Sequence, residues 1–149
     1  MNTDEFNLSR FIDAQDTTYR TALGEIHAGR KYSHWIWYVF PQLKGLGSSH
    51  TANFYGLDGL AEARAYLRHP LLVQRLREAI AAMLIHRSSS ATAILGELDA
   101  LKFRSCLTLF SLADPSEKIC SEALQCFFSG NSDPQTIRLL KTRGDIEDM

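Results

Sequence analysis

The sequence predicts an all-α fold, a compact single-domain bundle of about seven to nine helices. Apolar residues recur every three or four positions through most of the chain, which is the pattern of helices with one buried face. Asparagine, aspartate, serine and proline stand where these stretches begin, and glycines stand where several of them end. No internal repeat or long linker divides the chain, so we expect one domain over residues 1–149, with its folded core at about residues 6–141.

The composition limits the classes of partner that we expect for the chain. Hydrophobic residues make up 45% and charged residues 22%, as in ordinary soluble domains. Lys and Arg number 16 against 17 Asp and Glu, so the net charge of −1 gives nucleic-acid binding no support. The N-terminus lacks the pattern of a signal peptide, and the longest apolar run, residues 79–85, is too short to cross a bilayer. We therefore expect a cytoplasmic protein without membrane contact.

Two helices are expected at the N-terminus. Residues 8–14 form the first, which Asn7 leads, and Asp16 caps the second. Tyr19 and Ile26 then fall on one face at helical spacing. Gly29 provides the stop, because glycine readily adopts the left-handed conformation at a helix end.

Residues 30–42 form the most aromatic segment of the chain, with both tryptophans, two of the five tyrosines and one histidine. By propensity, this segment is typical of a buried strand. No second run resembles it, and a lone strand would leave its backbone polar groups unpaired. We therefore expect a helix that Ser33 caps and that ends near Pro41.

The middle of the chain is expected to hold a loop followed by three helical segments. Residues 43–49, rich in glycine and serine, form the loop. Asp58 caps a helix that runs to Leu67, and Pro70 opens the clearest helix of the chain. Residues 91–95 add one more turn before Gly96. The apolar stripe of the clearest helix consists of Leu72, Leu76, Ala79, Ile80, Met83 and Leu84.

Three helices are expected in the last third of the chain. A strongly apolar helix covers residues 99–113. Two Asp-Pro pairs, at residues 114–115 and 133–134, then place an N-cap and a first-position proline at two further helix starts. Gly130 ends the first of these two helices. Residues 142–149 are expected to be a frayed, acidic tail.

Cationic residues occur in the aromatic segment and in the loop that follows it. No acidic residue lies between Glu25 and Asp58, whereas Arg30 and Lys31 fall in this interval, so the segment is expected to be locally positive. The loop at residues 43–49 places glycines beside hydroxyl groups, including that of Ser48. Backbone N–H groups in such a loop can point toward an anion.

The tryptophans and His34 allow two interpretations each. Trp35 or Trp37 would stack on a ring of a ligand, or would anchor the core. His34 would be a general acid or base, which Asp13 orients, or a hydrogen-bonded structural imidazole. Gln42, at the end of the same segment, would orient a ligand through hydrogen bonds.

The helix at residues 99–113 carries the second cationic segment. At about 100° per residue, Lys102 falls inside the apolar arc of this helix, whereas Arg104 and Ser105 lie on the opposite side. Lys102 then either extends to water, points into a pocket that an anion neutralises, or pairs with a carboxylate. The available carboxylates are Asp13, Asp16 and Asp99.

Two functions remain open on these residues. The first is a site between helices for an anionic small molecule, such as a nucleotide or sugar phosphate, with catalysis undecided. Its expected catalytic residues are His34 and Asp13, and its expected binding residues are Arg30, Lys31, Trp35, Trp37, Gln42, Ser48, Lys102, Arg104 and Ser105. The alternative is a non-catalytic protein-binding or assembly module, whose aromatic segment is core or interface. Neither a metal nor a cofactor is expected, because the histidines and the three cysteines lack ligand spacing.

Four sequence blocks carry a resemblance to a known family. They are Arg-Phe-Ile-Asp-Ala-Gln (residues 10–15), Ser-His-Trp-Ile-Trp-Tyr-Val-Phe-Pro-Gln (33–42), Tyr-Leu-Arg-His-Pro-Leu (66–71) and Leu-Lys-Phe-Arg-Ser-Cys-Leu-Thr-Leu-Phe (101–110). The chain resembles the bacterial domain-of-unknown-function family 1810 over about residues 6–140. The resemblance implies a compact all-α domain, hence a helix in the aromatic segment, and no established activity. Cys106 stands where the family has serine, which argues against a nucleophile there. Members sometimes carry the label calpastatin, a disordered inhibitor that the helical stripes here contradict.

Overall fold

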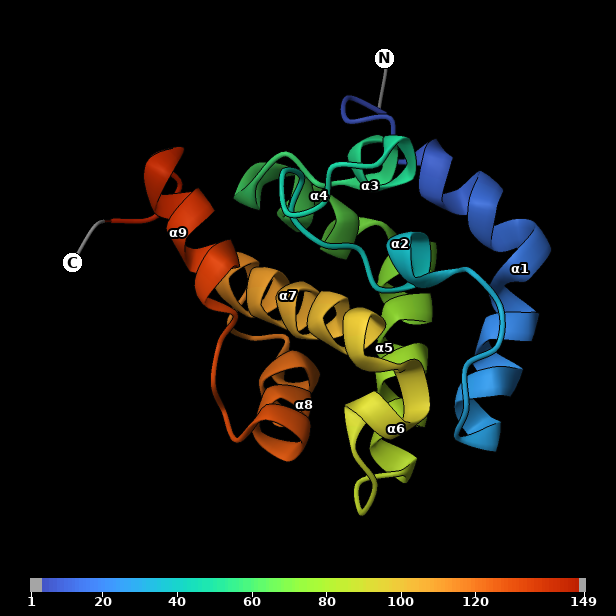
Figure 1. Cartoon of the computed structure of the whole chain (residues 1–149). Coiled ribbons are helices and arrows are strands. Elements are labelled where there is room, and N and C mark those ends of the chain that lie inside the picture. The colour runs from blue at the N-terminus through green and yellow to red at the C-terminus, as the bar shows by residue number, and fades with distance from the viewer. Residues whose placement is uncertain (1–3, 148–149) are drawn as a thin grey trace.

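The computed structural model describes residues 4–147, which form nine helices and no sheet, so the predicted fold class is confirmed (Figure 1). The helices are α1 (Ser9–Ala28), α2 (Ile36–Val39), α3 (His50–Tyr55), α4 (Leu60–Arg68), α5 (Pro70–Ile85), α6 (Ala91–Leu95), α7 (Glu97–Ala113), α8 (Lys118–Phe128) and α9 (Pro134–Thr142). A single parallel bridge joins Leu43 to Leu57. It holds the loop after α2 against the chain that enters α4.

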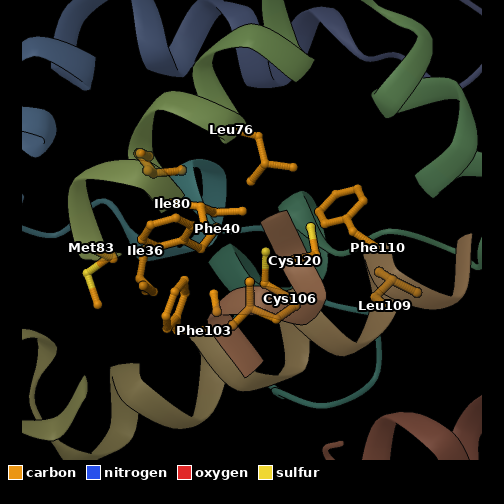
Figure 2. Packing of buried hydrophobic residues seen from close by; sticks show 14 of the residues in the cluster. Ile36, Phe40, Leu76, Ile80, Met83, Phe103, Cys106, Leu109, Phe110 and Cys120 are labelled. Carbon is orange, nitrogen blue, oxygen red and sulfur yellow. The ribbon is translucent and has the colours of Figure 1, made fainter. Parts of the chain in front are cut away.

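Helix α7 runs through the middle of the molecule and contacts α2, α4, α6, α8 and α9 (Figure 1). Its apolar face is central to one continuous core. Figure 2 shows Phe103 of α7 beside Phe40, which directly follows α2, and their ring centroids lie 4.6 Å apart. Each aromatic side chain buried in this way contributes about 2 to 3 kcal/mol through the removal of apolar surface from water. The aromatic segment is therefore held to α7.

The predicted stripe of α5 is confirmed, since all six of its residues are buried. Pro70 opens this helix as expected, and the ring of His69 caps it. Asp133 and Pro134 open α9 as predicted, with the Asp133 carboxylate accepting from Thr136 N at 2.9 Å. Helix α6 also appears where the single turn was expected. Local start signals therefore predict these helices well.

The N-terminal helix is one continuous element, so the prediction of two helices was wrong. Neither glycine nor proline interrupts residues 9–23, and Asp16 does not act as an N-cap. Instead, Asp16 pairs with Arg75 of α5 at 3.3 Å. Gly29 ends α1 as predicted, with a φ of 80° that favours glycine.

The aromatic segment contains less helix than predicted. Helix α2 is one turn long, and Ser33 does not cap it, because the Ser33 hydroxyl donates to Glu25 at 2.6 Å. An additional short helix, α3, was not predicted. The side chain of Ser49 caps it by accepting from Ala52 N at 3.1 Å.

Two helix starts also differ from the prediction. Asp145, not Asp58, caps α4, because Asp145 Oδ2 accepts from Leu60 N at 3.0 Å. Residue 145 belongs to the stretch expected to be a frayed tail, and this hydrogen bond attaches it to α4. Helix α8 begins at Lys118 rather than at residue 115, since the Asp114 carboxylate accepts from Ser116 N and forms a separate turn.

A buried ion pair beneath the loop after α2 was not predicted. Arg10 of α1 contacts Glu62 of α4 at 2.9 Å, and their side chains are 8% and 2% exposed. The remaining donors of Arg10 reach backbone carbonyls, including that of Phe54 at 2.8 Å. Glu62 also accepts from Asp58 N at 2.9 Å. This hydrogen bonding satisfies two charges that would otherwise be costly to bury.

Candidate functional site

Trp35 lies in the core, so its ring faces are not available to a ligand. Its side chain is 1% exposed, and its indole N–H donates to Glu25 Oε1 at 2.9 Å. The same carboxylate accepts from the backbone N–H groups of Tyr32 and Ser33. Burial would raise the pKa of Glu25, but hydrogen bonds from the Ser33 hydroxyl, from the two backbone N–H groups and from the indole lower it to about 2. Glu25 is therefore an anion that fixes the start of the aromatic segment.

Asp99 brings the two cationic segments together. Its carboxylate contacts Lys31 Nζ at 2.8 Å through one oxygen and Lys102 Nζ at 3.4 Å through the other. Lys31 also lies over the ring of Trp35, with Nζ 5.0 Å from the centroid. Of the alternatives for Lys102, the structure therefore shows pairing with Asp99. The longer contact leaves Lys102 less neutralised than Lys31, whose side chain is only 8% exposed.

A groove of about 370 Å³ lies beside this lysine pair, between the loop after α2, helix α7 and the start of α9. Three of the predicted binding residues meet there, namely Gln42, Lys102 and Ser105. The other lining residues are Leu46, Gly47, Leu98, Leu101, Asp133 and Gln135. The groove thus combines apolar walls with one cation, one carboxylate, two amides and a hydroxyl.

Gln42 is the unusual polar residue of this groove. The residue is 6% exposed, and its side-chain amide, which no hydrogen bond reaches within residues 4–147, keeps contact with solvent. Its backbone is fixed, since its carbonyl accepts from Leu57 N at 3.0 Å. Gln42 therefore offers one donor group and one acceptor group to whatever enters the groove.

The other polar groups of the groove are held in place by local hydrogen bonds. Ser105 donates to the carbonyl of Leu101 at 3.1 Å, which leaves its oxygen lone pairs as acceptors. Asp133 Oδ2 accepts from Thr136 N and from the Thr136 hydroxyl, so Asp133 is an ordered carboxylate. Lys102, with 24% of its side chain exposed, is the cation of the groove.

Arg104 does not reach the groove. It donates to the carbonyl oxygens of Asn131 and Ser132 at 2.9 and 3.0 Å, and its guanidinium lies 5.9 Å from the ring centroid of Phe128. Arg104 thereby ties α7 to the connection between α8 and α9. It neither contacts His34 nor lines the groove, so the structure does not bring all the predicted cations together.

The remaining predicted binding residues also lie outside the groove. Arg30 lies at the surface over the ring of Tyr32, and Trp37 packs partly buried against the core. Ser48 is exposed in the loop, where its carbonyl accepts from Asn53.

The two predicted catalytic residues are not paired. His34 is exposed, and its carbonyl accepts from the Tyr38 hydroxyl at 3.3 Å. Asp13 is exposed on α1, and no hydrogen bond or ion pair joins it to His34 in the described chain. Neither lines the groove. His34 and Asp13 therefore do not form the predicted pair in the described chain.

Sequence reasoning missed Leu98, Asp133 and Gln135 as lining residues. Leu98 and Leu101 are 73% and 52% exposed, which is unusual for leucine on an apolar helix. Both leucines lie outside the apolar arc of the predicted helix, and this position could have identified them as surface residues. For Asp133 and Gln135 no local signal exists, because their place depends on how α9 packs on α7.

Two classes of site find no support in residues 4–147. No group of three or more His, Cys, Asp or Glu side chains there is placed to hold a metal ion. No helix in that part of the chain is long and apolar enough to cross a membrane.

Comparisons with known proteins extend over nearly the whole chain. The family described as "Protein of unknown function (DUF1810)" matches residues 5–140. The crystal structure of the conserved hypothetical protein Rv1873 from Mycobacterium tuberculosis is similar to this one, with a TM-score of 0.89 and 43% sequence identity. The match covers 91% of this chain and 97% of that chain. A comparison with curated proteins finds no match.

Proposed function

The chain belongs to the DUF1810 family, and we propose that the groove between the loop after α2, helix α7 and the start of α9 binds an anionic small molecule of the sugar-phosphate class. The observation that carries this proposal is the side-chain amide of Gln42, which lies on the groove wall, is open to solvent and has no hydrogen-bond partner among the described residues. A ligand in the groove would therefore meet an amide donor and an amide acceptor that no other described residue occupies.

Lys102 supplies the charge that an anionic group requires. Asp99 lies 2.8 Å from Lys31 but 3.4 Å from Lys102, so the charge of Lys102 is the less neutralised of the two. A phosphate oxygen in contact with this ammonium would form a charge-assisted hydrogen bond. Such a bond contributes about 1.5–3 kcal/mol, which corresponds to roughly ten- to hundredfold in affinity.

The other lining groups suit sugar hydroxyls better than a nucleobase. A hydroxyl donates and accepts, and the groove offers the acceptors Asp133 and Ser105 together with the amides of Gln42 and Gln135. No lining residue of this groove is aromatic. A base would find no ring to stack on, which favours a sugar phosphate over a nucleotide.

A thermal-shift titration tests the proposal directly. Glucose 6-phosphate should raise the melting temperature of the wild-type protein in proportion to the logarithm of its concentration, as mass action requires. Glucose and inorganic phosphate should give smaller shifts, because each offers only part of the ligand. The variant Lys102→Ala should lose the shift, whereas Lys118→Ala, which removes an exposed lysine at the start of α8, should keep it. A Lys102→Ala protein that shifts as the wild type does would refute the proposal.

A second candidate function is protein binding through the same face. The specific observation is that Leu98 and Leu101 are 73% and 52% exposed, one helical turn apart. Exposed apolar pairs of this kind occur at interfaces. Self-association through them would appear as a concentration-dependent mass in analytical ultracentrifugation, which the double change Leu98→Gln and Leu101→Gln would abolish. If the protein is a monomer at all concentrations, self-association is excluded and ligand binding is favoured as the function of the groove.

A further inference from the structure

A second polar hollow, of about 620 Å³, lies where the N-terminal segment meets the end of α4 and the start of α5. It is separate from the groove at Lys102, with which it shares no lining residue. The residues that determine its chemistry are Glu5, Phe6, Arg64, Arg68, His69 and Pro70. Three of the four charged or titratable side chains are basic, so the hollow suits an anion.

Arg64 is anchored with its outer nitrogens free. Its Nε donates to the carbonyl of Ala113 at 3.0 Å, which fixes the plane of the guanidinium. Within residues 4–147, its two terminal nitrogens have no hydrogen-bond partner. A guanidinium held in this way can present both nitrogens to the oxygens of one phosphate group, at little further cost in side-chain entropy.

Arg68 follows Arg64 by one helical turn, so the two side chains lie on the same face of α4. Arg68 is exposed and forms no hydrogen bond or ion pair with any other described residue. Asp114 lies outside this hollow and lines a separate one with both arginines. The Asp114 carboxylate is occupied by the Ser116 hydroxyl and N–H, which lower its pKa, and the arginines lower it further. This carboxylate does not line the hollow.

His69 completes the basic set with a donor of fixed direction. Its Nδ1 accepts from Leu72 N at 3.4 Å and so caps α5. Because Nδ1 is the acceptor, the proton of the neutral ring is on Nε2, which is left to donate. Within the block at residues 66–71, His69 thus caps α5 through one ring nitrogen and keeps an unused donor on the other.

The remaining wall is apolar and includes an aromatic ring. Phe6, Leu8 and Pro70 line the hollow, and Phe6 is only partly buried. An accessible phenyl ring offers a face on which a planar heterocycle can stack, which is worth about 1–3 kcal/mol for a base. This aromatic wall distinguishes the hollow from the groove at Lys102, whose lining residues include no aromatic side chain.

We infer that this hollow is a binding site for a phosphomonoester that carries a planar ring, the class that nucleoside monophosphates represent. The phosphate lies between the terminal nitrogens of Arg64, the guanidinium of Arg68 and Nε2 of His69. The ring lies against Phe6. Glu5, the acidic member of the lining, is exposed.

Isothermal titration calorimetry of the intact protein with AMP tests this inference, with adenosine and inorganic phosphate as partial ligands at constant ionic strength. AMP should bind saturably with one site, adenosine should show no saturable heat, and phosphate should bind at least tenfold more weakly than AMP. Arg68→Ala and Arg68→Gln should each weaken AMP binding about tenfold or more. His69→Asn keeps a capping acceptor for Leu72 N but removes the ring donor, so it should weaken binding severalfold without lowering the melting temperature.

Two control variants separate a site from general attraction to positive charge. Arg20→Ala removes an exposed arginine of α1, and Lys102→Ala disables the groove of the proposed function. Both should bind AMP as the wild type does. No saturable binding of AMP, equal binding of adenosine and AMP, or equal weakening in Arg20→Ala and Arg68→Ala would overturn the inference. Loss of AMP binding in Lys102→Ala would also overturn it, since the ligand would then occupy the first groove.

Discussion

Glu25 and Trp35 are joined by a hydrogen bond of 2.9 Å from the indole N–H to the carboxylate, and this bond connects α1 to the aromatic segment. The Ser33 hydroxyl and two backbone N–H groups donate to the same side chain. One carboxylate thus orders residues 32–35 ahead of α2. Lys31, which precedes them, then reaches Asp99 at 2.8 Å.

Replacement of this carboxylate should destabilise the fold. Glu25→Gln keeps the size of the side chain but loses the charge and presents an N–H group where an acceptor is needed. We expect the free energy of unfolding to fall by about 2 kcal/mol, the scale of hydrogen bonds to a charged group. Urea denaturation followed by tryptophan fluorescence measures this change. Glu122→Gln, at an exposed position of α8, is the matched control and should lie within about 0.5 kcal/mol of the wild type.

The same carboxylate should make stability depend on acidity. The folded pKa of Glu25 is lowered to about 2, below the value of about 4.3 expected for the unfolded chain. The stabilisation is therefore fully present above about pH 4.3 and is lost as the pH falls toward 2. The wild-type protein should lose more stability than Glu25→Gln between pH 5 and pH 2.5. Parallel stability curves for the two proteins over that interval would show that Glu25 does not titrate in this way.

The buried pair of Arg10 and Glu62 should be costly to break and less costly to remove. Either Arg10→Met or Glu62→Gln leaves a charge 8% exposed or less without its partner. We expect each single change to cost about 3–5 kcal/mol. The double change Arg10→Met and Glu62→Gln should cost clearly less than the sum of these two single changes, as measured by equilibrium unfolding. Additive costs would mean that the two residues stabilise the fold independently.

The cap that Asp145 provides to α4 should make residues 59 and 145 interdependent. A Cβ at Gly59 would collide with the carboxylate of Asp145, which accepts from Leu60 N. Gly59→Ala and Asp145→Ala should therefore each lower stability by about 1 kcal/mol, the usual cost of a lost N-cap. Together they should cost little more than one of them. Fully additive losses in thermal unfolding would exclude a shared cap.

Asp99→Asn should affect stability and binding in opposite directions. Lys31 would lose its carboxylate in a mostly buried place, so the melting temperature should fall. Lys102 would lose a neighbouring negative charge, so the affinity for glucose 6-phosphate should rise. A unit charge about 6 Å away in a water-like dielectric changes binding about threefold. Calorimetric titration that shows weaker binding would contradict the assignment of Lys102 as the anion-binding group.

The helices with local signals at both ends could be predicted from the sequence. Pro70 and Asp133 open α5 and α9 as expected, and the apolar stripe of α5 is buried throughout. A helix start was predicted wrongly where a residue distant in the sequence, and not the adjacent one, caps the helix. Asp145 replaced Asp58 as the cap of α4, although 85 residues separate it from Leu60. A cap from so distant a residue depends on tertiary packing, and no local sequence pattern predicts it.

The candidate site shows the same limit. The interval between Glu25 and Asp58 contains no acid, so the sequence predicted a positive segment. In the structure, Asp99 folds onto Lys31 from 68 positions further along the chain. Lys31 and Lys102 lie close together because they share this carboxylate, but only Lys102 lines the groove. Arg104 instead binds the carbonyls that precede α9, which could not be predicted without the position of that helix.

If the proposed function is correct, Gln42 and Lys102 hold one ligand in one groove. Two-dimensional ¹H–¹⁵N NMR of the protein during titration with glucose 6-phosphate tests it most directly, because the side-chain NH₂ signals of Gln42 and Gln135 report contact with the ligand. We expect saturable shifts of these signals and of backbone signals in residues 42–47, 98–105 and 133–135, and we expect them to be absent in Lys102→Ala. Unchanged Gln42 signals at saturation, or shifts centred elsewhere, would contradict the proposed function.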